Sequence, residues 1–324
     1  MARVAVLDDW QKVARACGDW SALEAQAEVR FFHEAFPSED AAASALASFD
    51  VIVATRERTP FARSLIDRLP ALRMFGLTGV RAGKIDLAYL QQRGVTVCYT
   101  DGGPGVASTA ELALALMLAG ARRIAEAESS LRAGRFQLDA PTGSVLAGKT
   151  LGVLGLGQIG TRVARYGSAL GMNVVAWSTN LTDERAREAG VQRVEKDALL
   201  ERSDVVSLHL VLSERTRGVL GAAEIERLKR GAIIVNTSRA GLVDEQALIR
   251  AAREGRIVAA LDVYDREPLP AHHALSTCPN TVLTPHLGYS VLEVYRAFYA
   301  QSVENVLAWL GGAPTRVLAP LAGA

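Results

Sequence analysis

Short apolar runs alternate with stretches of helical periodicity along the chain, and this alternation constrains the fold more than any other feature. Before residue 100 the runs are RVAVLD, EVRFF, DVIVAT, LRMFGL and VTVCYT. A second series follows residue 149: TLGVLGLG, MNVVAWS, DVVSLHL, AIIVNTS, VAALDVY and TVLTPH. Runs rich in Val, Ile and Leu are typical of parallel strands covered by helices on both faces. The sequence therefore predicts an α/β protein with two doubly wound parallel sheets.

Length, charge and cysteine content narrow the classes of function. At 324 residues with 49% apolar content, the chain is too long for one ordinary core and suits two domains. The net charge is +1 with acids and bases mixed throughout, which disfavours nucleic acid and anionic lipid as partners. The longest apolar stretch, residues 112–121, is too short to span a bilayer. Cys17, Cys98 and Cys278 have no metal-ligand spacing, which favours a reducing, cytoplasmic compartment and no metal site.

Between the two series of strands the sequence predicts one long helix. Ser108 with Glu111 three residues later has the spacing of a capping box, and the helical pattern continues to about Gly134. Its first half is apolar on nearly all faces, which predicts a buried helix. A second long helical pattern follows the last strand and continues to Gly311.

The stretch LGVLGLGQIG (151–160) contains the strongest local motif. Gly155, Gly157 and Gly160 have the G-x-G-x-x-G spacing between a predicted strand and a predicted helix. The first glycine permits a tight turn, the second lets a pyrophosphate approach the backbone, and the third lets the helix pack on the strand. Amide donors at the helix N-terminus favour the same anion. We therefore expect a dinucleotide site that includes Gln158 and Ile159, with a ligand-free glycine turn as the less favoured alternative.

The cofactor preference stays open from the sequence. A site that prefers NAD carries Asp or Glu at the end of the next strand, about twenty residues on, for the ribose 2′-hydroxyl. The stretch VVAWSTN places Ser178 there, which removes the charge that would repel a 2′-phosphate. No arginine follows directly, since Asp183 and Glu184 precede Arg185. The pattern predicts NAD(H) or NADP(H) without choosing between them.

Charged side chains follow the ends of three consecutive predicted strands. NTSRAG supplies Arg239, LDVYDREP supplies Asp262 and Glu267, and TPHLGYS supplies His286. The carboxyl ends of parallel strands meet at the edge where doubly wound sheets hold their ligands. A histidine there can move the proton that carbonyl reduction requires, a neighbouring carboxylate fixes its ring, and an arginine binds a carboxylate through two hydrogen bonds. Each residue alone has a structural explanation, but together with the glycine loop they predict a nicotinamide-dependent oxidoreductase.

The motifs GLGQIG, NTSRAGLVDE, ALDVYDREPLP and TPHLGYS, in this order, resemble the D-isomer-specific 2-hydroxyacid dehydrogenase family. This family includes phosphoglycerate, glyoxylate/hydroxypyruvate and formate dehydrogenases. The resemblance implies that Arg239 grips the substrate carboxylate and carbonyl, that Glu267 pairs with the histidine, and that His286 is the acid/base. Formate dehydrogenases carry Gln in place of Glu267, so that activity is disfavoured.

The resemblance also implies residues around the nicotinamide and the substrate. Asp262 matches the residue that holds the nicotinamide amide. The same cofactor site would include Thr237, Ser238 and Gly288. A loop that often reads G-V-G-x-D-N in the family reads GVRAGK here, and the backbone amides of Gly79, Val80 and Arg81 would hold the substrate carboxylate. Whether the Arg81 side chain faces a second anionic group or solvent stays open, as does the role of Lys84.

The resemblance implies a domain plan and an activity. A flavodoxin-like substrate domain would be discontinuous, comprising 1–102 and 291–324, and a Rossmann cofactor domain would comprise 103–290. Because family members are usually dimers, we expect a homodimer. The expected activity is that of a cytoplasmic NAD(P)-dependent 2-hydroxyacid dehydrogenase, an oxidoreductase acting on a small 2-keto or 2-hydroxy acid. Two alternatives are a dinucleotide-sensing binding protein and a phosphite-type dehydrogenase on the same fold, and the substrate side chain and the direction stay open.

Overall fold

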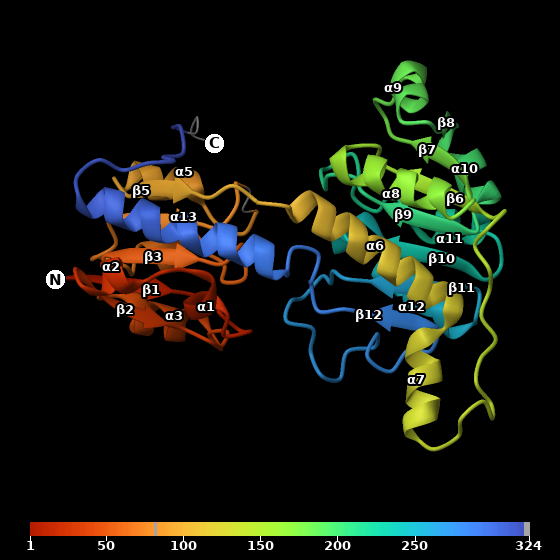
Figure 1. The fold of residues 1–324 in the computed structure, drawn as a ribbon, viewed down its shortest axis with the longest axis horizontal. Coiled ribbons are helices and arrows are strands. Elements are labelled where there is room, and N and C mark those ends of the chain that lie inside the picture. Colours follow the sequence, from red (N-terminus) through yellow and green to blue (C-terminus); the bar gives the residue numbers. More distant parts are fainter. Residues whose placement is uncertain (81–82, 321–324) are drawn as a thin grey trace. The chain divides into compact units, whose positions relative to one another are not determined.

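The computed structural model describes residues 1–80 and 83–320, and the chain divides into two compact units. The first unit comprises Met1–Pro104 with Val291–Ala324, and the second comprises Gly105–Ser290. Each unit contains one parallel sheet with helices on both faces (Figure 1). The predicted α/β class with two doubly wound sheets is confirmed.

The sheet of the first unit has five parallel strands in the order β2-β1-β3-β4-β5, which is the flavodoxin-like order. All five apolar runs predicted before residue 100 form strands. Two of these strands, β3 and β4, are buried along their whole length, which explains why their residues show no polar alternation. The strands are Ala2–Val6 (β1), Ala27–Phe31 (β2), Val51–Ala54 (β3), Met74–Leu77 (β4) and Thr96–Tyr99 (β5).

Helices cover both faces of this sheet. One face packs against Glu39–Leu46 (α3), Arg63–Ile66 (α4) and Leu87–Gln92 (α5). The other face packs against Ala14–Cys17 (α1), Ser21–Glu24 (α2) and the C-terminal helix Leu292–Leu310 (α13). The Phe298 and Tyr299 side chains of α13 are fully buried, so the predicted C-terminal helix is an integral part of the first unit.

The sheet of the second unit has seven parallel strands in the order β12-β11-β10-β9-β6-β7-β8. Counted from its own first strand this is 7-6-5-4-1-2-3, the Rossmann order extended by one strand. The six predicted strands are confirmed, while β8 was not predicted because two polar residues make no apolar run. The strands are Thr150–Leu154 (β6), Asn173–Trp177 (β7), Gln192–Arg193 (β8), Val205–Leu208 (β9), Ala232–Asn236 (β10), Ile257–Leu261 (β11) and Thr281–Leu283 (β12).

Successive residues of the central strands point into two separate apolar cores. Within β10, Ile233 and Val235 belong to one core and Ile234 to the other, as the alternation of side chains along a strand requires. The first core is covered by Gly105–Arg122 (α6) and Gln158–Ala169 (α8). The second core is covered by Lys196–Arg202 (α10), Ala222–Arg227 (α11) and Glu245–Arg253 (α12). The remaining helices of this unit are Ile124–Arg132 (α7), Asp183–Glu188 (α9) and the 3₁₀ turn Ala240–Leu242.

The prediction of one helix capped by Ser108 and continuing to Gly134 is wrong. The helix α6 begins at Gly105, and the Ser108 hydroxyl donates instead to the Gly288 carbonyl at 2.8 Å. Arg123 has a left-handed backbone with φ +56°, which ends α6 and lets the chain turn into α7. Among the described residues, α6 is the one helix that is long and apolar enough to cross a membrane, and here it packs against α8, β10 and β11.

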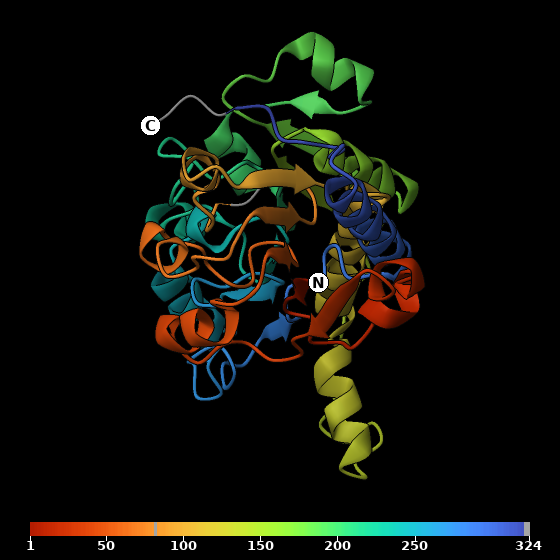
Figure 2. The same cartoon turned by 90° about the vertical axis from the view of Figure 1, so that its left-hand side faces the viewer.

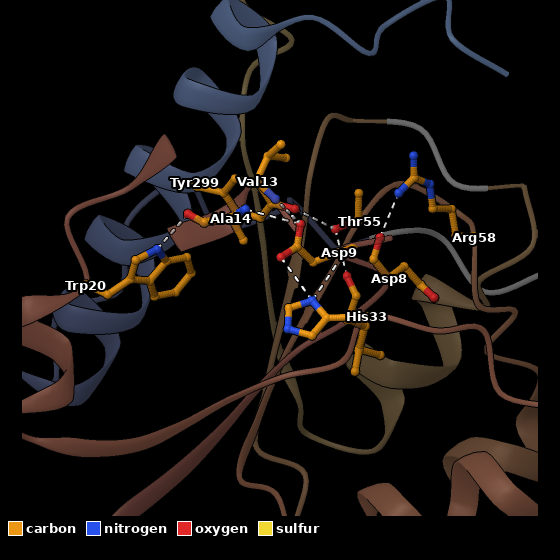
Figure 3. A network of polar contacts seen from close by, with 10 residues as sticks. Asp8, Asp9, Val13, Ala14, Trp20, His33, Thr55, Arg58 and Tyr299 are labelled. Atoms are coloured by element: carbon orange, nitrogen blue, oxygen red, sulfur yellow. Dashed lines mark hydrogen bonds and ion pairs between the residues drawn. The ribbon is translucent and has the colours of Figure 1, made fainter. Parts of the chain in front are cut away.

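A polar network lies at the carboxyl end of β1 in the first unit (Figure 3). The Asp9 carboxylate accepts the backbone N–H groups of Val13 and Ala14 at 2.8 and 3.1 Å, and its other oxygen lies 3.3 Å from Nδ1 of His33. These contacts fix the turn that leads from β1 into α1. The side chain of Arg58 donates to the backbone carbonyl of Asp8 at 2.6 Å.

Candidate functional site

The glycine loop between β6 and α8 has the geometry that its motif predicts. Gly155 has φ +102°, and a Cβ there would lie 2.8 Å from the His209 carbonyl carbon and oxygen. A Cβ on Gly160 would overlap the Gly155 carbonyl oxygen. Both positions therefore require glycine for the protein's own packing. Gly157 differs, because nothing lies within 4 Å of the place where its Cβ would be.

The residues around this loop fit a dinucleotide. The space above Gly157 adjoins the N-terminus of α8, where unpaired amides and the helix dipole favour a pyrophosphate. Gln158 is exposed and Ile159 half-buried beside it. At the same sheet edge, directly after β10, the Thr237 hydroxyl oxygen is buried and has no hydrogen-bond partner within the described part of the chain. A buried hydroxyl without a partner is the kind of group that a bound ligand satisfies.

The turn after β7 carries Ser178, the position predicted to face the adenosine ribose. Ser178 is half-buried, and its carbonyl accepts the Leu181 N–H at 3.1 Å. The following Thr179 and Asn180 are exposed. No charged side chain in this turn selects for or against a 2′-phosphate.

His286 and Glu267, predicted from two different strand ends, lie in contact. Nδ1 of His286 is 2.7 Å from one oxygen of Glu267, and the backbone N–H of Tyr264 donates to the other oxygen at 3.0 Å. Both side chains are partly exposed, at 31% for His286 and 22% for Glu267, so solvent or a ligand can approach them. The Tyr264 hydroxyl donates to the Thr284 carbonyl at 2.9 Å, which ties the two segments together.

Asp262 fixes the turn that carries His286. Its carboxylate is fully buried and accepts the Thr284 hydroxyl at 2.6 Å and the N–H groups of Leu287 and Gly288 at 2.7 and 2.9 Å. Burial raises the pKa of Asp262, while these hydrogen bonds and the charge of His286 act in the opposite direction. The predicted contact with a nicotinamide amide stays a prediction, and the turn contacts are an additional role that the sequence did not indicate.

The segment after β10 orders Ser238 and Arg239. The Asn236 side chain accepts the Ser238 N–H and donates to the Arg239 carbonyl, both at 3.0 Å. The Ser238 hydroxyl donates to the Leu210 carbonyl at 2.7 Å, and Nη1 of Arg239 donates to the Ser238 carbonyl at 2.8 Å. Arg239 is half-buried at the same sheet edge as Asp262.

His209, at the end of β9, is a neutral neighbour of the glycine loop. Its Nε2 lies 2.8 Å from the Ser207 hydroxyl. Burial lowers the pKa of His209 to about 4, so it is uncharged near neutral pH. This favours a structural role over that of a second proton donor.

The predicted substrate loop belongs to the first unit. Gly79 has φ +86°, its N–H donates to the Thr100 hydroxyl at 3.0 Å, and a Cβ there would overlap the Arg56 guanidinium. Val80 is exposed, and Arg81 lies outside the described residues. The Lys84 carbonyl accepts the Phe61 N–H at 2.9 Å, which fixes the backbone of the loop's end.

Two groups of residues at the site were not predicted from the sequence. Tyr264 and Thr284 hold Glu267 and Asp262 in place, and both lie inside motifs that were read only for their charged residues. Ser108 and Thr109 of α6 both donate to the Gly288 carbonyl, which no local pattern reveals. Within residues 1–80 and 83–320, no group of three or more His, Cys, Asp or Glu side chains is placed to hold a metal ion.

Comparison with known proteins points to one family. The family model described as D-isomer specific 2-hydroxyacid dehydrogenase, NAD binding domain, matches residues 114–288. A D-3-phosphoglycerate dehydrogenase of Archaeoglobus fulgidus is 38% identical over 82% of this chain and 50% of its own length. A hydroxypyruvate reductase of Thermotoga maritima is 37% identical over 81% of this chain and 85% of its own. The crystal structure of a phosphoglycerate oxidoreductase from Vibrio cholerae o395 is 34% identical with a TM-score of 0.90, covering 97% of this chain and 100% of that chain. The chain spans about half the length of the first curated relatives that it matches, the D-3-phosphoglycerate dehydrogenases of Archaeoglobus fulgidus and Methanocaldococcus jannaschii.

Proposed function

Because the chain belongs to the D-isomer specific 2-hydroxyacid dehydrogenase family, we propose that it is an NAD(P)-dependent oxidoreductase that interconverts a small 2-keto acid and a D-2-hydroxy acid. The observation that carries this proposal is the contact between His286 and Glu267. The pair follows strands β11 and β12, whose carboxyl ends share one sheet edge with the glycine loop after β6. A proton donor and a dinucleotide loop on one edge are what carbonyl reduction requires.

Each polar residue at the edge has a distinct role in the proposed reaction. The loop Gly155–Gly160 would hold the dinucleotide, which would supply the hydride. Nδ1 of His286 faces Glu267, which leaves Nε2 to donate a proton to the carbonyl oxygen. The Glu267 carboxylate stabilises the charged imidazole before the transfer and fixes the ring. Arg239 binds the substrate carboxylate and polarises the neighbouring carbonyl.

The dinucleotide is NADH or NADPH, and Ser178 is the residue that bears on the choice. A hydroxyl at this position accepts the ribose 2′-hydroxyl and does not repel a 2′-phosphate. The proposal therefore includes both cofactors, and the two are compared directly in the test.

The test is the loss of nicotinamide absorbance with NADH and NADPH in parallel, across glyoxylate, hydroxypyruvate and its phosphate ester, pyruvate and a bulky aromatic 2-keto acid. We expect turnover of at least one 2-keto acid, lost in His286→Ala. A matched control is His273→Ala, since His273 also faces a glutamate, with Nε2 3.4 Å from Glu245, but belongs to a different segment. Near-normal turnover in His286→Ala would overturn the mechanism.

Two further functions are separate outcomes of the same assay. Dinucleotide binding without turnover of any 2-keto acid would favour a sensing protein. Turnover of phosphite, but of no 2-keto acid, would favour a phosphite-type dehydrogenase that uses Arg239, Glu267 and His286.

The functional molecule in this proposal is a homodimer formed through the second unit. Helix α7 extends away from the sheet of this unit in both views, and the following segment returns from its tip to β6 (Figures 1 and 2). The segment has exposed apolar side chains at Ile124, Leu131, Phe136, Leu138 and Val145. Exposed apolar patches of this kind mark protein interfaces.

The test of the dimer is the mass in solution by light scattering. We expect a dimer that Phe136→Ser with Leu138→Ser weakens by at least about tenfold. Val211→Ser is the control, because Val211 is also an exposed apolar residue of this unit but lies outside the segment. A monomeric unsubstituted protein at micromolar concentration would contradict the dimer.

A cytoplasmic location is also proposed, supported by three buried cysteines that form no disulfide.

A further inference from the structure

A pocket of about 200 Å³ lies at the amino ends of β6, β9 and β10, at the opposite sheet edge from the glycine loop. Lys149 precedes β6, Asp204 precedes β9, and Lys229 and Arg230 precede β10, so the strands themselves bring these side chains together. The apolar side of the pocket is formed by Leu146, Ile233 and Val258.

The charges that line the pocket are unbalanced. Four cationic residues, Arg123, Lys149, Lys229 and Arg230, line the pocket together with one carboxylate, Asp204. Lys229 lies 3.1 Å from Asp204, and Arg123 lies 2.8 Å from Glu126 outside the pocket. Neither Lys149 nor Arg230 forms an ion pair with any residue in the described ranges. Cations gathered over an apolar wall attract an anion more strongly than the same cations in open solvent.

Backbone contacts fix the walls of the pocket. The Ser144 N–H donates to the Ala121 carbonyl at 2.7 Å, and a Cβ on Gly143 would lie 2.9 Å from Cα of Arg122, so this segment lies tightly on the end of α6. On the opposite wall, the Gly231 N–H donates to the Arg256 carbonyl at 2.6 Å.

The acidic side chain of the pocket is also held in place. The Asp204 oxygen that contacts Lys229 accepts the Thr150 N–H at 2.8 Å as well. An ammonium has three donors, so Lys229 keeps N–H groups for a ligand while it contacts Asp204.

We propose that this pocket binds a small anion with a phosphate or carboxylate group, at a site separate from the dinucleotide loop. Lys149 and Arg230 donate to the anion directly, and Lys229 contributes a third positive charge. The volume suits an inorganic phosphate, a phosphate ester head or a short dicarboxylate, and it is below the range of pockets for larger ligands.

The test is calorimetric titration of the full chain with inorganic phosphate and, separately, with malonate, at constant ionic strength and with NADH present. We expect one site with a dissociation constant in the millimolar range or tighter. Arg230→Ala and Lys149→Ala each weaken binding about tenfold, since each removes a charge-assisted hydrogen bond. Arg250→Ala, the loss of an exposed arginine on α12, leaves binding unchanged.

Every outcome bears on the proposal. Binding of phosphate alone, malonate alone or both supports it and assigns the ligand chemistry. No binding of either anion overturns it, and so does an equal weakening by Arg250→Ala, which would indicate a general charge effect. Loss of binding in Arg239→Gln also overturns it, because the anion would then occupy the candidate active site. Melting temperatures of the two pocket variants within a few degrees of the parent exclude unfolding as the cause.

Discussion

Nδ1 of His286 lies 2.7 Å from Glu267, and the second oxygen of the same carboxylate accepts the Tyr264 N–H at 3.0 Å. One oxygen of the Glu267 carboxylate is thus fixed by the backbone of Tyr264, and the other oxygen fixes the imidazole ring of His286. A histidine fixed through one nitrogen presents the other nitrogen in a single orientation. The two residues therefore act as one unit, and their substitutions should not have independent effects.

This coupling predicts non-additive kinetics. His286→Ala should lower kcat for 2-keto acid reduction by about 10² to 10⁴, the usual contribution of a general acid. Glu267→Gln keeps a hydrogen-bonding group but removes the charge, so its loss should be smaller. The double variant should match His286→Ala alone, because Glu267 acts through the histidine. Steady-state rates of the three variants measure this, and losses that multiply would show that Glu267 acts independently.

Replacement of Asp262 tests whether its carboxylate stabilises the turn that carries His286. Asp262→Asn replaces one carboxylate oxygen, an acceptor, with an NH₂ group, a donor. The three groups in contact with the carboxylate are all donors, so at least one of the hydrogen bonds is lost. We expect a loss of about 1 to 3 kcal/mol in the free energy of unfolding, measured with denaturant. Asp265→Asn, an exposed neighbour in the same segment, is the control. Equal stability of the two variants would show that the turn does not depend on Asp262.

The sheets were predictable because burial on both faces leaves short runs of Val, Ile and Leu, and these runs alternate regularly with helical stretches along the chain. The interruption at Arg123 was not predictable, because helical periodicity continues through it and the break is a single left-handed residue. Ser108 had the spacing of a cap, but a hydroxyl bonds to whichever carbonyl is near, and the carbonyl of Gly288 lies 180 residues away. Contacts at such separations are set by tertiary packing rather than local pattern.

That His286 lies at the same sheet edge as a carboxylate was predictable from the rule that carboxyl ends of parallel strands share an edge. The choice of Glu267 as its partner came from the resemblance to a known family. The role of Asp262 in the turn was not predictable, because its partners Leu287 and Gly288 contribute only backbone N–H groups, which every residue type except proline has. Thr237 was predicted as a cofactor-site residue from the family resemblance alone. No sequence pattern indicates that its hydroxyl is buried without a hydrogen-bond partner among the described residues, because that depends on the surrounding packing.

The three glycines of the loop should separate into two classes on substitution. Gly157→Ala places a methyl group in open space, so the free energy of unfolding should change by less than about 1 kcal/mol. Dinucleotide binding should nevertheless weaken by at least about tenfold, because the methyl group would occupy the space that we assign to the pyrophosphate. Fluorescence titration with NADH and denaturant unfolding measure the two effects.

Gly160→Ala is the contrasting variant. Its methyl group would overlap the Gly155 carbonyl, which is backbone and cannot move freely, so the protein itself should lose about 1 to 3 kcal/mol of stability. If Gly157→Ala destabilised the protein as much as Gly160→Ala, or left NADH binding unchanged, the assignment of the open space to a pyrophosphate would be wrong.

The buried Asp8 carboxyl of the first unit predicts a pH dependence of stability (Figure 3). It is 1% exposed and accepts the Thr59 N–H and hydroxyl at 3.1 and 2.9 Å, and burial raises its pKa from 3.8 to about 6. Between pH 4 and 6 the folded state therefore keeps a proton that the unfolded state has lost, so stability falls as the pH rises and becomes level above 6. The full effect is about 3 kcal/mol at most.

The stability of the parent minus that of Asp8→Asn should decrease from pH 4 to pH 7, measured by denaturant unfolding. Glu34→Gln, which removes an exposed carboxylate of the first unit that forms no ion pair within the described residues, should differ from the parent by a constant amount. A constant difference for Asp8→Asn as well would show that Asp8 is ionised throughout.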